Sequence, residues 1–443
     1  MRFALISLGC PKNQVDADVM CRRLLEAGHT TTGDLSEADL ILVNTCGFIE
    51  SAKTEAIENI LMACSYKEQN PQLKVVVTGC LAERYREEIH KEIPEADGVV
   101  GLGSNEAIVS ILERIVHGEQ VQSYGAKTDL PLGGQRVIST PSHYAYLKIA
   151  EGCDNRCYYC AIPSIRGPLR SRKVEDCVSE AKWLAAQGVK ELILVAQDVT
   201  AYGDDLGENA ICRLLDELQQ VEGLEWIRLL YAYPERITDE FIQAMVRNSK
   251  VLHYLDMPIQ HSETRVLKSM NRKGDNAVIC SAVERLRKAM PDITLRTTLI
   301  AGYPGETEEE FAAMQQFVRE MKFDRLGCFA YSQEEGTVAA TMENQIDEQT
   351  KEQRADSIMR IQTGIMAEKQ AQFVGKVLHV LCDGQEQESG LYLCRSTGDA
   401  PDIDGAVCVK SDIPLYPGEF YDVFVEESDE YDLYAVLANT MKE

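Results

Sequence analysis

Cys153-Asp154-Asn155-Arg156-Cys157-Tyr158-Tyr159-Cys160 is the stretch that decides the fold, because it places three cysteines on one short segment. The spacing is C-x3-C-x2-C, and the segment closely follows residues 146–149, a short, mainly apolar stretch that predicts a β-strand. Three thiolates on such a loop can hold three irons of a four-iron, four-sulfur cube, and the fourth iron then lacks a protein ligand. An open metal position allows an exogenous molecule to coordinate there. The sequence therefore predicts a reactive cluster at this loop.

A zinc site completed by another side chain, such as His143, is the alternative interpretation of the same loop. Zinc sites usually come as paired C-x2-C units, and the sequence contains no second pair. A lone histidine is also more often a packing or surface residue. The cluster with an open iron is the preferred hypothesis.

The residues around this loop repeat a strand–helix rhythm from about position 144 to 335. Predicted helices such as 174–187 and 209–220 separate the strands, which we expect at 146–149, 191–195, 227–231, 254–258, 294–300 and 326–331. Six βα units of this kind predict a partial (β/α)6 barrel, whose chemistry gathers where the strands end. Polar groups follow several strands, as at Gln197-Asp198 and Gln260-His261-Ser262. Each of these alone could equally be ordinary loop polarity or a helix cap.

A second group of cysteines, Cys10, Cys46 and Cys80, lies in the first 120 residues, which read as alternating strand and helix. Each cysteine comes just after a predicted strand, at 3–7, 40–44 and 75–78. The strands of one parallel sheet end along one edge, so these cysteines can converge. Gly9 and Gly79 allow tight backbone beside a bulky cluster. Three buried cysteines acting as small hydrophobic residues are the alternative, but the repeated placement favours a second three-thiolate site with one open iron.

The chain divides at a linker, residues 123–142, which holds three glycines and two prolines. A helix is predicted at 348–369, followed by short alternating strands at 376–382, 406–410 and 421–426. We therefore predict an α/β protein of three domains. They are an N-terminal α/β domain with a parallel sheet (1–122), a central partial (β/α)6 barrel (140–368) and a small antiparallel β-barrel (369–440).

Composition limits the location and the partners of the chain. The apolar stretch 3–8 is too short for a signal-peptide core, and no apolar run reaches the roughly 18–20 residues that span a bilayer. A cytosolic protein without a membrane partner is expected, so its fifteen cysteines should be largely reduced. Nine of them have no ligand spacing and are predicted to be packing or surface thiols: Cys21, Cys64, Cys177, Cys212, Cys280, Cys328, Cys382, Cys394 and Cys408. The formal charge of −26 repels polyanions and attracts basic proteins.

The first cysteine motif on the first βα loop resembles that of the radical S-adenosylmethionine superfamily. In that superfamily an aromatic residue precedes the last cysteine, as Tyr159 does here. The resemblance implies that S-adenosylmethionine binds the open iron and is split to a 5′-deoxyadenosyl radical after the cluster is reduced. It also implies that Gln197, Ile300 and Gly302, like Tyr159, contact this cofactor.

Two three-cysteine sites in one chain resemble the methylthiotransferase family, and the match extends to a C-terminal barrel similar to its TRAM domain. The RimO branch is indicated by four stretches: Ser7-Leu8-Gly9-Cys10-Pro11-Lys12-Asn13, Glu151-Gly152-Cys153, Pro163-Ser164-Ile165-Arg166-Gly167 and Leu169-Arg170-Ser171-Arg172. That branch methylthiolates the β-carbon of an aspartate in the small-subunit ribosomal protein S-twelve. The resemblance implies two 4Fe–4S clusters, one held by Cys153, Cys157 and Cys160 and an auxiliary one held by Cys10, Cys46 and Cys80. It further implies an electron donor.

Charge bears on the choice of substrate within that family. From Glu368 onward about sixteen Asp and Glu stand against five Lys and Arg, the opposite of an RNA-binding module. An acidic docking domain suits a basic ribosomal protein, and nucleic acid is not expected as the substrate. The alternatives are a tRNA adenosine methylthiotransferase and a non-catalytic iron–sulfur or zinc protein. One feature remains open: Arg166, Arg170, Arg172 and Lys173 form a basic cluster that could bind phosphate, bind a carboxylate of cofactor or substrate, or be a solvated loop.

Overall fold

A parallel sheet forms the N-terminal domain in the computed structural model, which describes residues 1–438. Its strand order is β2-β1-β3-β4-β5-β6. The strands are β1 (Arg2–Ser7), β2 (Thr30–Thr31), β3 (Leu40–Thr45), β4 (Lys74–Gly79), β5 (Gly98–Val100) and β6 (Val121–Ser123). β3 is buried along its whole length because helices cover both faces of the sheet. The sequence predicted β1, β3 and β4 but missed the other three, which are too short to show a hydrophobic period.

Helices pack on the two faces of this sheet in separate hydrophobic clusters. α1 (Pro11–Glu26) and α5 (Ile108–Val116) pack on one face. α2 (Glu50–Ser65), α3 (Cys80–Arg84) and α4 (Arg86–Glu92) pack on the other. The first five strands follow a doubly wound order whose direction reverses between β1 and β3. In such sheets the ligand crevice lies at that point, beyond the carboxyl ends of the strands.

The central domain is, as predicted, a partial barrel of six parallel strands, and their order is β14-β13-β12-β11-β10-β7. The strands are β7 (Tyr144–Lys148), β10 (Glu191–Val195), β11 (Trp226–Leu229), β12 (Val251–Asp256), β13 (Thr294–Ala301) and β14 (Arg325–Ala330). A short ribbon of β8 (Ala150–Glu151) and β9 (Arg170–Ser171) brackets the cysteine loop. The helices are α6 (Ile162–Arg166), α7 (Val174–Ala186), α8 (Ile211–Leu218), α9 (Asp239–Arg247), α10 (Thr264–Ser269), α11 (Asn276–Ala289), α12 (Glu308–Met321) and α13 (Glu348–Gln370). Within residues 1–438, no helix combines the length and the apolar character that a bilayer crossing requires.

A closed five-stranded barrel completes the described chain, in the order β15-β16-β17-β19-β18. Its strands are β15 (Val377–Gln385), β16 (Tyr392–Arg395), β17 (Val407–Lys410), β18 (Phe420–Ser428) and β19 (Leu433–Leu437). The sequence predicted antiparallel pairing, but β17 and β19 pair in parallel. The reason is that β18 crosses to pair with β15, which leaves the gap beside β17 to be closed by β19. Positions 439–440 of the predicted C-terminal domain lie outside the described residues.

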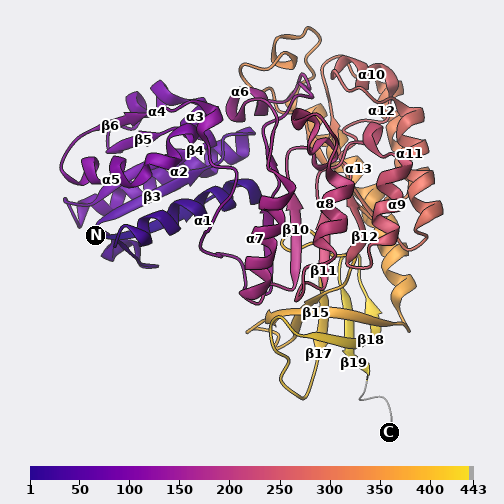
Figure 1. Ribbon diagram of the computed structural model, residues 1–443. Coiled ribbons are helices and arrows are strands. Elements are labelled where there is room, and N and C mark those ends of the chain that lie inside the picture. The colour runs from indigo at the N-terminus through magenta and orange to yellow at the C-terminus, as the bar shows by residue number, and fades with distance from the viewer. Residues whose placement is uncertain (439–443) are drawn as a thin grey trace.

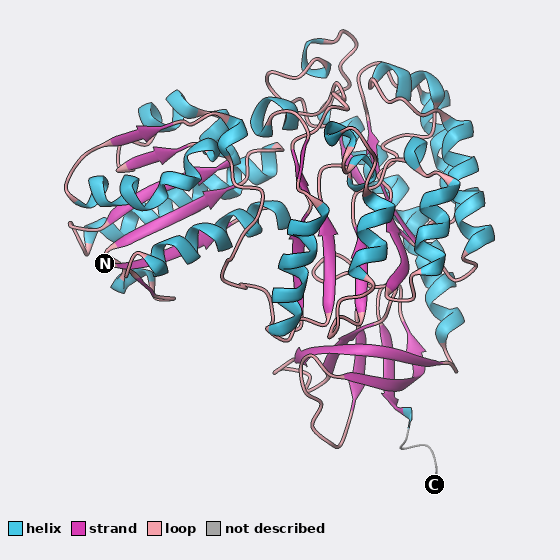
Figure 2. Cartoon of the chain, in the orientation of Figure 1, coloured by secondary structure: helices cyan, strands magenta, loops and turns pink. Residues whose placement is uncertain are grey.

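The N-terminal domain lies beside the central barrel, and the C-terminal barrel lies below it (Figure 1). The strands of the N-terminal sheet point their carboxyl ends toward the central barrel, on the side of α6, as the arrows in Figure 2 show. The C-terminal barrel covers the other end, where the central strands begin. The carboxyl ends of both parallel sheets therefore face the same region of the molecule, and the C-terminal barrel lies away from it.

Buried ion pairs fix the C-terminal barrel to the central one. The Arg395 guanidinium donates to Asp383 at 2.7 and 3.0 Å and to the fully buried Glu191 at the start of β10. Glu191 also accepts from Arg228 Nε at 2.7 Å, and Asp383 contacts His143 Nε2 at 2.7 Å. These groups satisfy one another's charges, so the interface has a single defined geometry.

We expect Arg395→Ala to lower the free energy of unfolding by about 3–5 kcal/mol, because it leaves the buried Glu191 short of one cation. Denaturant unfolding of the apoprotein measures the effect. The control is Lys410→Ala, which removes an exposed cation from the same barrel and should cost less than about 0.5 kcal/mol. Equal losses in the two variants would show that the Arg395 contacts do not stabilise the interface.

Candidate active site

The cysteine loop of the central barrel begins at the carboxyl end of β7 and is held by backbone bonds. Cys153 N–H donates to Gly167 O at 3.1 Å, and Cys160 N–H donates to Cys157 O at 3.0 Å. Gly152 has a φ of +75°, and a Cβ there would lie 2.0 Å from Pro168 O, so only glycine fits. We call Cys153, Cys157 and Cys160 the radical-site cysteines. The backbone bonds and the Gly152 contact fix the path of the loop that carries them.

The other three predicted ligands lie near one another because the strands that precede them end at the same edge of the sheet. Ser7 pairs with Asn44, and Asn44 pairs with Thr78, so Cys10, Cys46 and Cys80 follow within three residues of one line across the sheet. We call them the N-terminal cysteines. Gly9 lies directly on Cys46, since a Cβ at Gly9 would approach Cys46 Cβ to 2.8 Å. Cys10, which follows Gly9, and Cys46 therefore flank the point where the strand order reverses. In sheets of this kind a ligand binds at that point.

Each group contains one buried cysteine, Cys80 or Cys157, and two that are partly exposed. Burial raises the pKa of Cys80 to about 12, and the nearby Cys10 and Cys46 thiols act in the same direction while Arg166 opposes them. Burial likewise raises the pKa of Cys153 to about 11 and that of Cys160 to about 12, and in each case Cys157 acts in the same direction. These thiols carry protons at neutral pH until irons displace them, so cluster assembly releases protons.

Each cysteine group offers three thiol donors, the number that a four-iron cube with one open iron takes. All fifteen cysteines are free thiols, and each group offers three of them. Across residues 1–438 no three His, Cys, Asp or Glu side chains are arranged around one metal ion. Tetrahedral zinc would need thiolates roughly 3.8 Å apart, from Zn–S bonds of about 2.3 Å, whereas a cube binds each thiolate through a different iron.

A cavity of about 540 Å³ opens beside the radical-site loop. Tyr159 and Ile300 line it, together with Gln260, Thr298, and Tyr331 after β14. The N-terminal domain supplies part of its wall through residues 48–51 at the start of α2. The two predicted cofactor contacts Tyr159 and Ile300 are thus placed together in one cavity between two domains.

The other two predicted contacts, Gln197 and Gly302, do not line this cavity. Gln197 Nε2 donates to Glu151 Oε1 at 2.7 Å, in a buried network behind the cysteine loop. Gly302 N–H donates to Glu306 at 3.0 Å, and a Cβ there would lie 2.4 Å from Lys351 Cγ of α13. Gly302 is glycine because the helix packs on it, and its φ of +75° also favours glycine.

Two side chains beside the radical-site cysteines were missed by the sequence analysis. Tyr233 OH lies 3.7 Å from Cys157 Sγ, and the Arg272 guanidinium stacks on the Tyr233 ring at 4.1 Å. Tyr233 comes shortly after β11, so the rule of polar groups at strand ends could have found it. Arg272 follows α10, and nothing in its local sequence places it near a cysteine.

Arg272 is suited to an anionic ligand. It is 7% exposed, and Nη2 donates to Pro258 O at 2.9 Å, while Nη1 is buried without a hydrogen-bond partner among residues 1–438. A buried guanidinium donor of this kind binds a carboxylate through a charge-assisted bond worth about 1.5–3 kcal/mol.

We expect Arg272→Gln to raise the KM for S-adenosylmethionine by about tenfold or more, because about 1.4 kcal/mol corresponds to a tenfold change in affinity. The measurement is the rate of 5′-deoxyadenosine release against cofactor concentration. Lys268→Gln, which removes an exposed cation from α10, is the matched control and should leave the KM unchanged. An unchanged KM in the Arg272 variant would rule out this contact.

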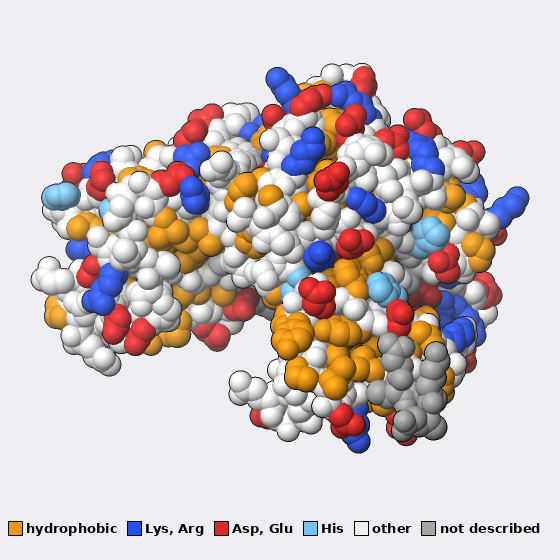
Figure 3. All heavy atoms as spheres, turned by 60° about the horizontal axis from the view of Figure 1, so that its bottom comes forward, with side chains coloured by type: hydrophobic (Ala, Val, Ile, Leu, Met, Phe, Trp, Pro, Cys, Tyr) orange, Lys and Arg blue, Asp and Glu red, His pale blue; other side chains and the backbone are white. Residues whose placement is uncertain are grey.

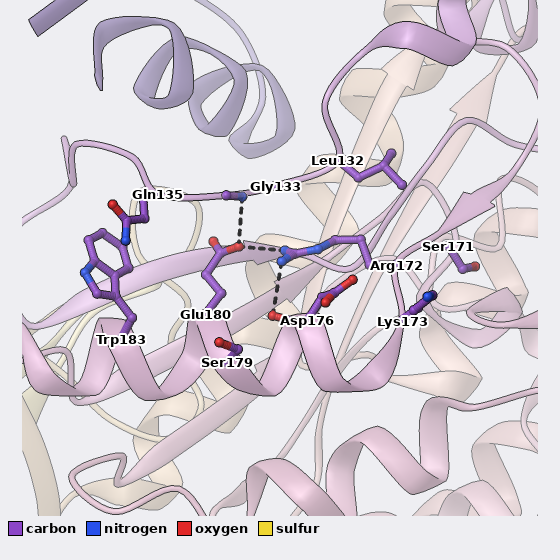
Figure 4. Close-up of a pocket in the computed structure, with 11 residues that line it drawn as sticks. Leu132, Gly133, Gln135, Ser171, Arg172, Lys173, Asp176, Ser179, Glu180 and Trp183 are labelled. Carbon is purple, nitrogen blue, oxygen red and sulfur yellow. Dashed lines mark hydrogen bonds and ion pairs between the residues drawn. The ribbon is translucent and has the colours of Figure 1, made fainter. Parts of the chain in front are cut away.

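The basic cluster after the cysteine loop is partly engaged by the protein itself. Arg166 is buried between the domains, and Arg170 Nη1 donates to the carbonyls of Thr128 and Leu130. Arg172 donates to Glu180 at 2.7 Å in the wall of a cavity of about 620 Å³, where the linker crosses α7 (Figure 4). Arg170 Nε and Nη2 are buried without a hydrogen-bond partner among residues 1–438, so this side chain is able to donate to an anion. The three arginines do not form a solvated loop.

A partial (β/α)6 barrel with three cysteines on its first βα loop, facing a cavity at the strand ends, defines a radical S-adenosylmethionine enzyme. The profile of the Radical SAM superfamily matches residues 147–318, and that of the TRAM domain matches 374–437. Residues 2–101 match the uncharacterized protein family UPF0004.

Proteins with known names extend the match to the full length. The chain is 47% identical to ribosomal protein uS12 methylthiotransferase RimO of Acetivibrio thermocellus, over 99% of this chain and 98% of that protein. It is 48% identical to the protein of the same name from Clostridioides difficile, over 98% of each. The solved structure of the radical S-adenosylmethionine methyltransferase TsrM from Kitasatospora setae shares the fold, with a TM-score of 0.57 and 15% identity over 74% of each chain. The chain belongs to the RimO family of methylthiotransferases, which confirms the resemblance seen in the sequence.

Proposed function

We propose that this protein inserts a methylthio group at the β-carbon of an aspartate in ribosomal protein uS12, with two 4Fe–4S clusters and S-adenosylmethionine. The named function of the full-length relatives supports this proposal. The observation that carries it is the meeting of two cysteine groups at one buried interface. Arg166 donates to Cys80 Sγ at 3.4 Å and to Glu151 at 2.7 Å, and Glu151 accepts from the N–H of Gly152, the residue before Cys153.

Each cluster is assigned to one cysteine group. The radical-site cysteines would hold the cluster that binds S-adenosylmethionine, and the N-terminal cysteines would hold the auxiliary cluster. When bound, these groups supply radical generation, sulfur and a methyl group, while the protein supplies orientation and a dry site. Tyr159, Ile300 and Tyr331 form the wall of the cavity that would exclude water.

In this proposal Gln197 and Gly302 support the cofactor site without lining the cavity. Gln197 Oε1 is buried without a partner among residues 1–438, so it is able to accept a hydrogen bond from a bound ligand. Gly302 lets α13 approach the end of β13, and Glu306 holds its N–H, which fixes the backbone next to Ile300.

The C-terminal barrel is the proposed docking surface for the protein substrate. Figure 3 shows hydrophobic side chains gathered on this barrel. The exposed large apolar residues there include Val377, Ile413 and Tyr416, and the domain is strongly acidic. A surface of this kind suits a basic protein and repels nucleic acid phosphates.

Docking there would leave the substrate spanning the central barrel, since the cysteine loop lies at its opposite end. Strands of five or six residues make that distance about 20 Å. A folded ribosomal protein, or an extended segment of more than about six residues, reaches across it. In this proposal the protein acts in the cytoplasm, where its ribosomal protein substrate is found. It receives electrons there from a separate donor.

Mass spectrometry of ribosomal protein uS12 and of digested tRNA, from cells with and without this gene, tests the substrate. We expect uS12 to gain about 46 Da, one methylthio group in place of hydrogen, only when the gene is present. A methylthiolated adenosine that depends on the gene, with unmodified uS12, would assign the protein to tRNA instead.

A further inference from the structure

Arg166 is a buried cation at the interface between the two cysteine-bearing domains. Its side chain is 1% exposed. Nη1 donates to Asp16 at 3.0 Å and to Glu151 at 2.7 Å, and Nη2 donates to Asn13 at 3.2 Å. The remaining donor, Nε, lies 3.4 Å from Cys80 Sγ. The guanidinium group of Arg166 thus binds residues of both domains, and its Nε edge faces the Cys80 sulfur.

Arg166 belongs to a buried network of two cations and two carboxylates, whose formal charges sum to zero. Lys148 Nζ is also buried and pairs with both Asp16 and Glu151. The network is already neutral without Cys80, so the charge of a metal-bound thiolate is added to a site whose nearest cation is Arg166.

The same arginine is tied to the radical-site loop. It is the last residue of α6, six positions after Cys160, and Gly167 O accepts from Cys153 N–H. Glu151, which Arg166 holds, accepts from Gly152 N–H at 3.2 Å. A displacement of Arg166 would therefore move a ligand of each group.

We propose that Arg166 is a positioning residue that raises the reduction potential of the auxiliary cluster and holds Cys80 in register with the radical-site loop. The proposal rests on the assignment of an auxiliary cluster to the N-terminal cysteines. Reduction adds negative charge to a cluster, and a hydrogen bond to a ligand sulfur together with a nearby cation stabilises that charge. Burial removes the water that would otherwise screen the interaction.

The test uses the full-length chain with Cys153, Cys157 and Cys160 all replaced by alanine, so that only the N-terminal cysteines can bind iron. In this background Arg166→Lys keeps the charge but loses the planar fork, and Arg166→Gln loses both. Lys173→Gln removes an exposed cation of the same loop and is the matched control. Iron content and the midpoint potential, followed by electron paramagnetic resonance during anaerobic redox titration, are the readouts.

We expect about four irons per chain in the background protein and in Arg166→Lys, with a lower midpoint potential in the lysine variant and a lower one again in Arg166→Gln. Lys173→Gln should match the background. An iron-loaded Arg166→Lys with an unchanged potential would overturn the proposal, even if Arg166→Gln fails to fold. A background protein that binds no iron would instead refute the auxiliary cluster itself, so the two failures are distinguishable.

Discussion

Replacing Cys157 with alanine is expected to abolish the release of 5′-deoxyadenosine, reducing it to the level without enzyme. Three thiolates are the fewest that leave a cube with one open iron, and Cys157 lies at the centre of the radical-site loop, 94% buried and next to Tyr233. Without it two irons lack protein ligands, and the cluster that would bind S-adenosylmethionine is lost or misplaced. Anaerobic assay of 5′-deoxyadenosine by chromatography, together with iron analysis, measures the effect.

The iron content should fall from about eight per chain to about four in this variant, because the N-terminal cysteines are untouched. Cys177→Ala is the control, since Cys177 is a fully buried cysteine of α7 that contacts Tyr202 and lies in the hydrophobic core. It should cost stability but leave cofactor cleavage measurable. Full cleavage activity in Cys157→Ala would defeat the assignment of the radical-site cysteines.

The second large effect is expected from Cys46→Ala, which should eliminate methylthiolation of uS12 while 5′-deoxyadenosine release continues. Cys46 follows β3 at the reversal point of the N-terminal sheet and is in contact with the Gly9 backbone that leads to Cys10. Its loss leaves two thiolates for the auxiliary cluster, but it does not touch the radical-site loop. Mass spectrometry of uS12 and the 5′-deoxyadenosine assay on the same sample separate the two activities.

Cys64→Ala is the matched control for Cys46→Ala, because Cys64 lies on α2 of the same domain and packs in its hydrophobic cluster. That variant should retain about eight irons and modify uS12. If Cys46→Ala still produced methylthiolated uS12, the sulfur would have to come from a site other than the N-terminal cysteines.

The strands of the central barrel show how much of the fold the local sequence pattern predicted. β10 was predicted with its observed bounds because it is a short, fully buried, largely apolar run, and the other strands of the central barrel were predicted to within a few residues. β5 and β6 have three residues each, so no period could reveal them. The parallel pairing of β17 with β19 depends on where β18 crosses, which local sequence does not encode.

The contacts of the charged residues could not be predicted from the local sequence pattern. In sequence, Arg166 belongs to a basic loop that looks ready for phosphate, yet in the fold it is surrounded by Asp16 and Glu151, 150 and 15 positions away. Lys12 likewise reaches across to the central barrel, where it lies 4.0 Å from the Tyr231 ring centre. Their partners come from other elements, so their roles appear only once the domains pack.

The sequence by itself indicated two groups of three cysteines and the strands that precede them, because ligand spacing and strand period are local properties of the chain. The class of enzyme followed from the resemblance of these motifs to a known family. Only the tertiary structure decided that the two cysteine groups share one buried interface, that Arg166 joins them and that the C-terminal barrel closes the opposite end. The physical reason is that charge pairing and burial depend on which surfaces come together in space, and residues far apart in the chain form those surfaces.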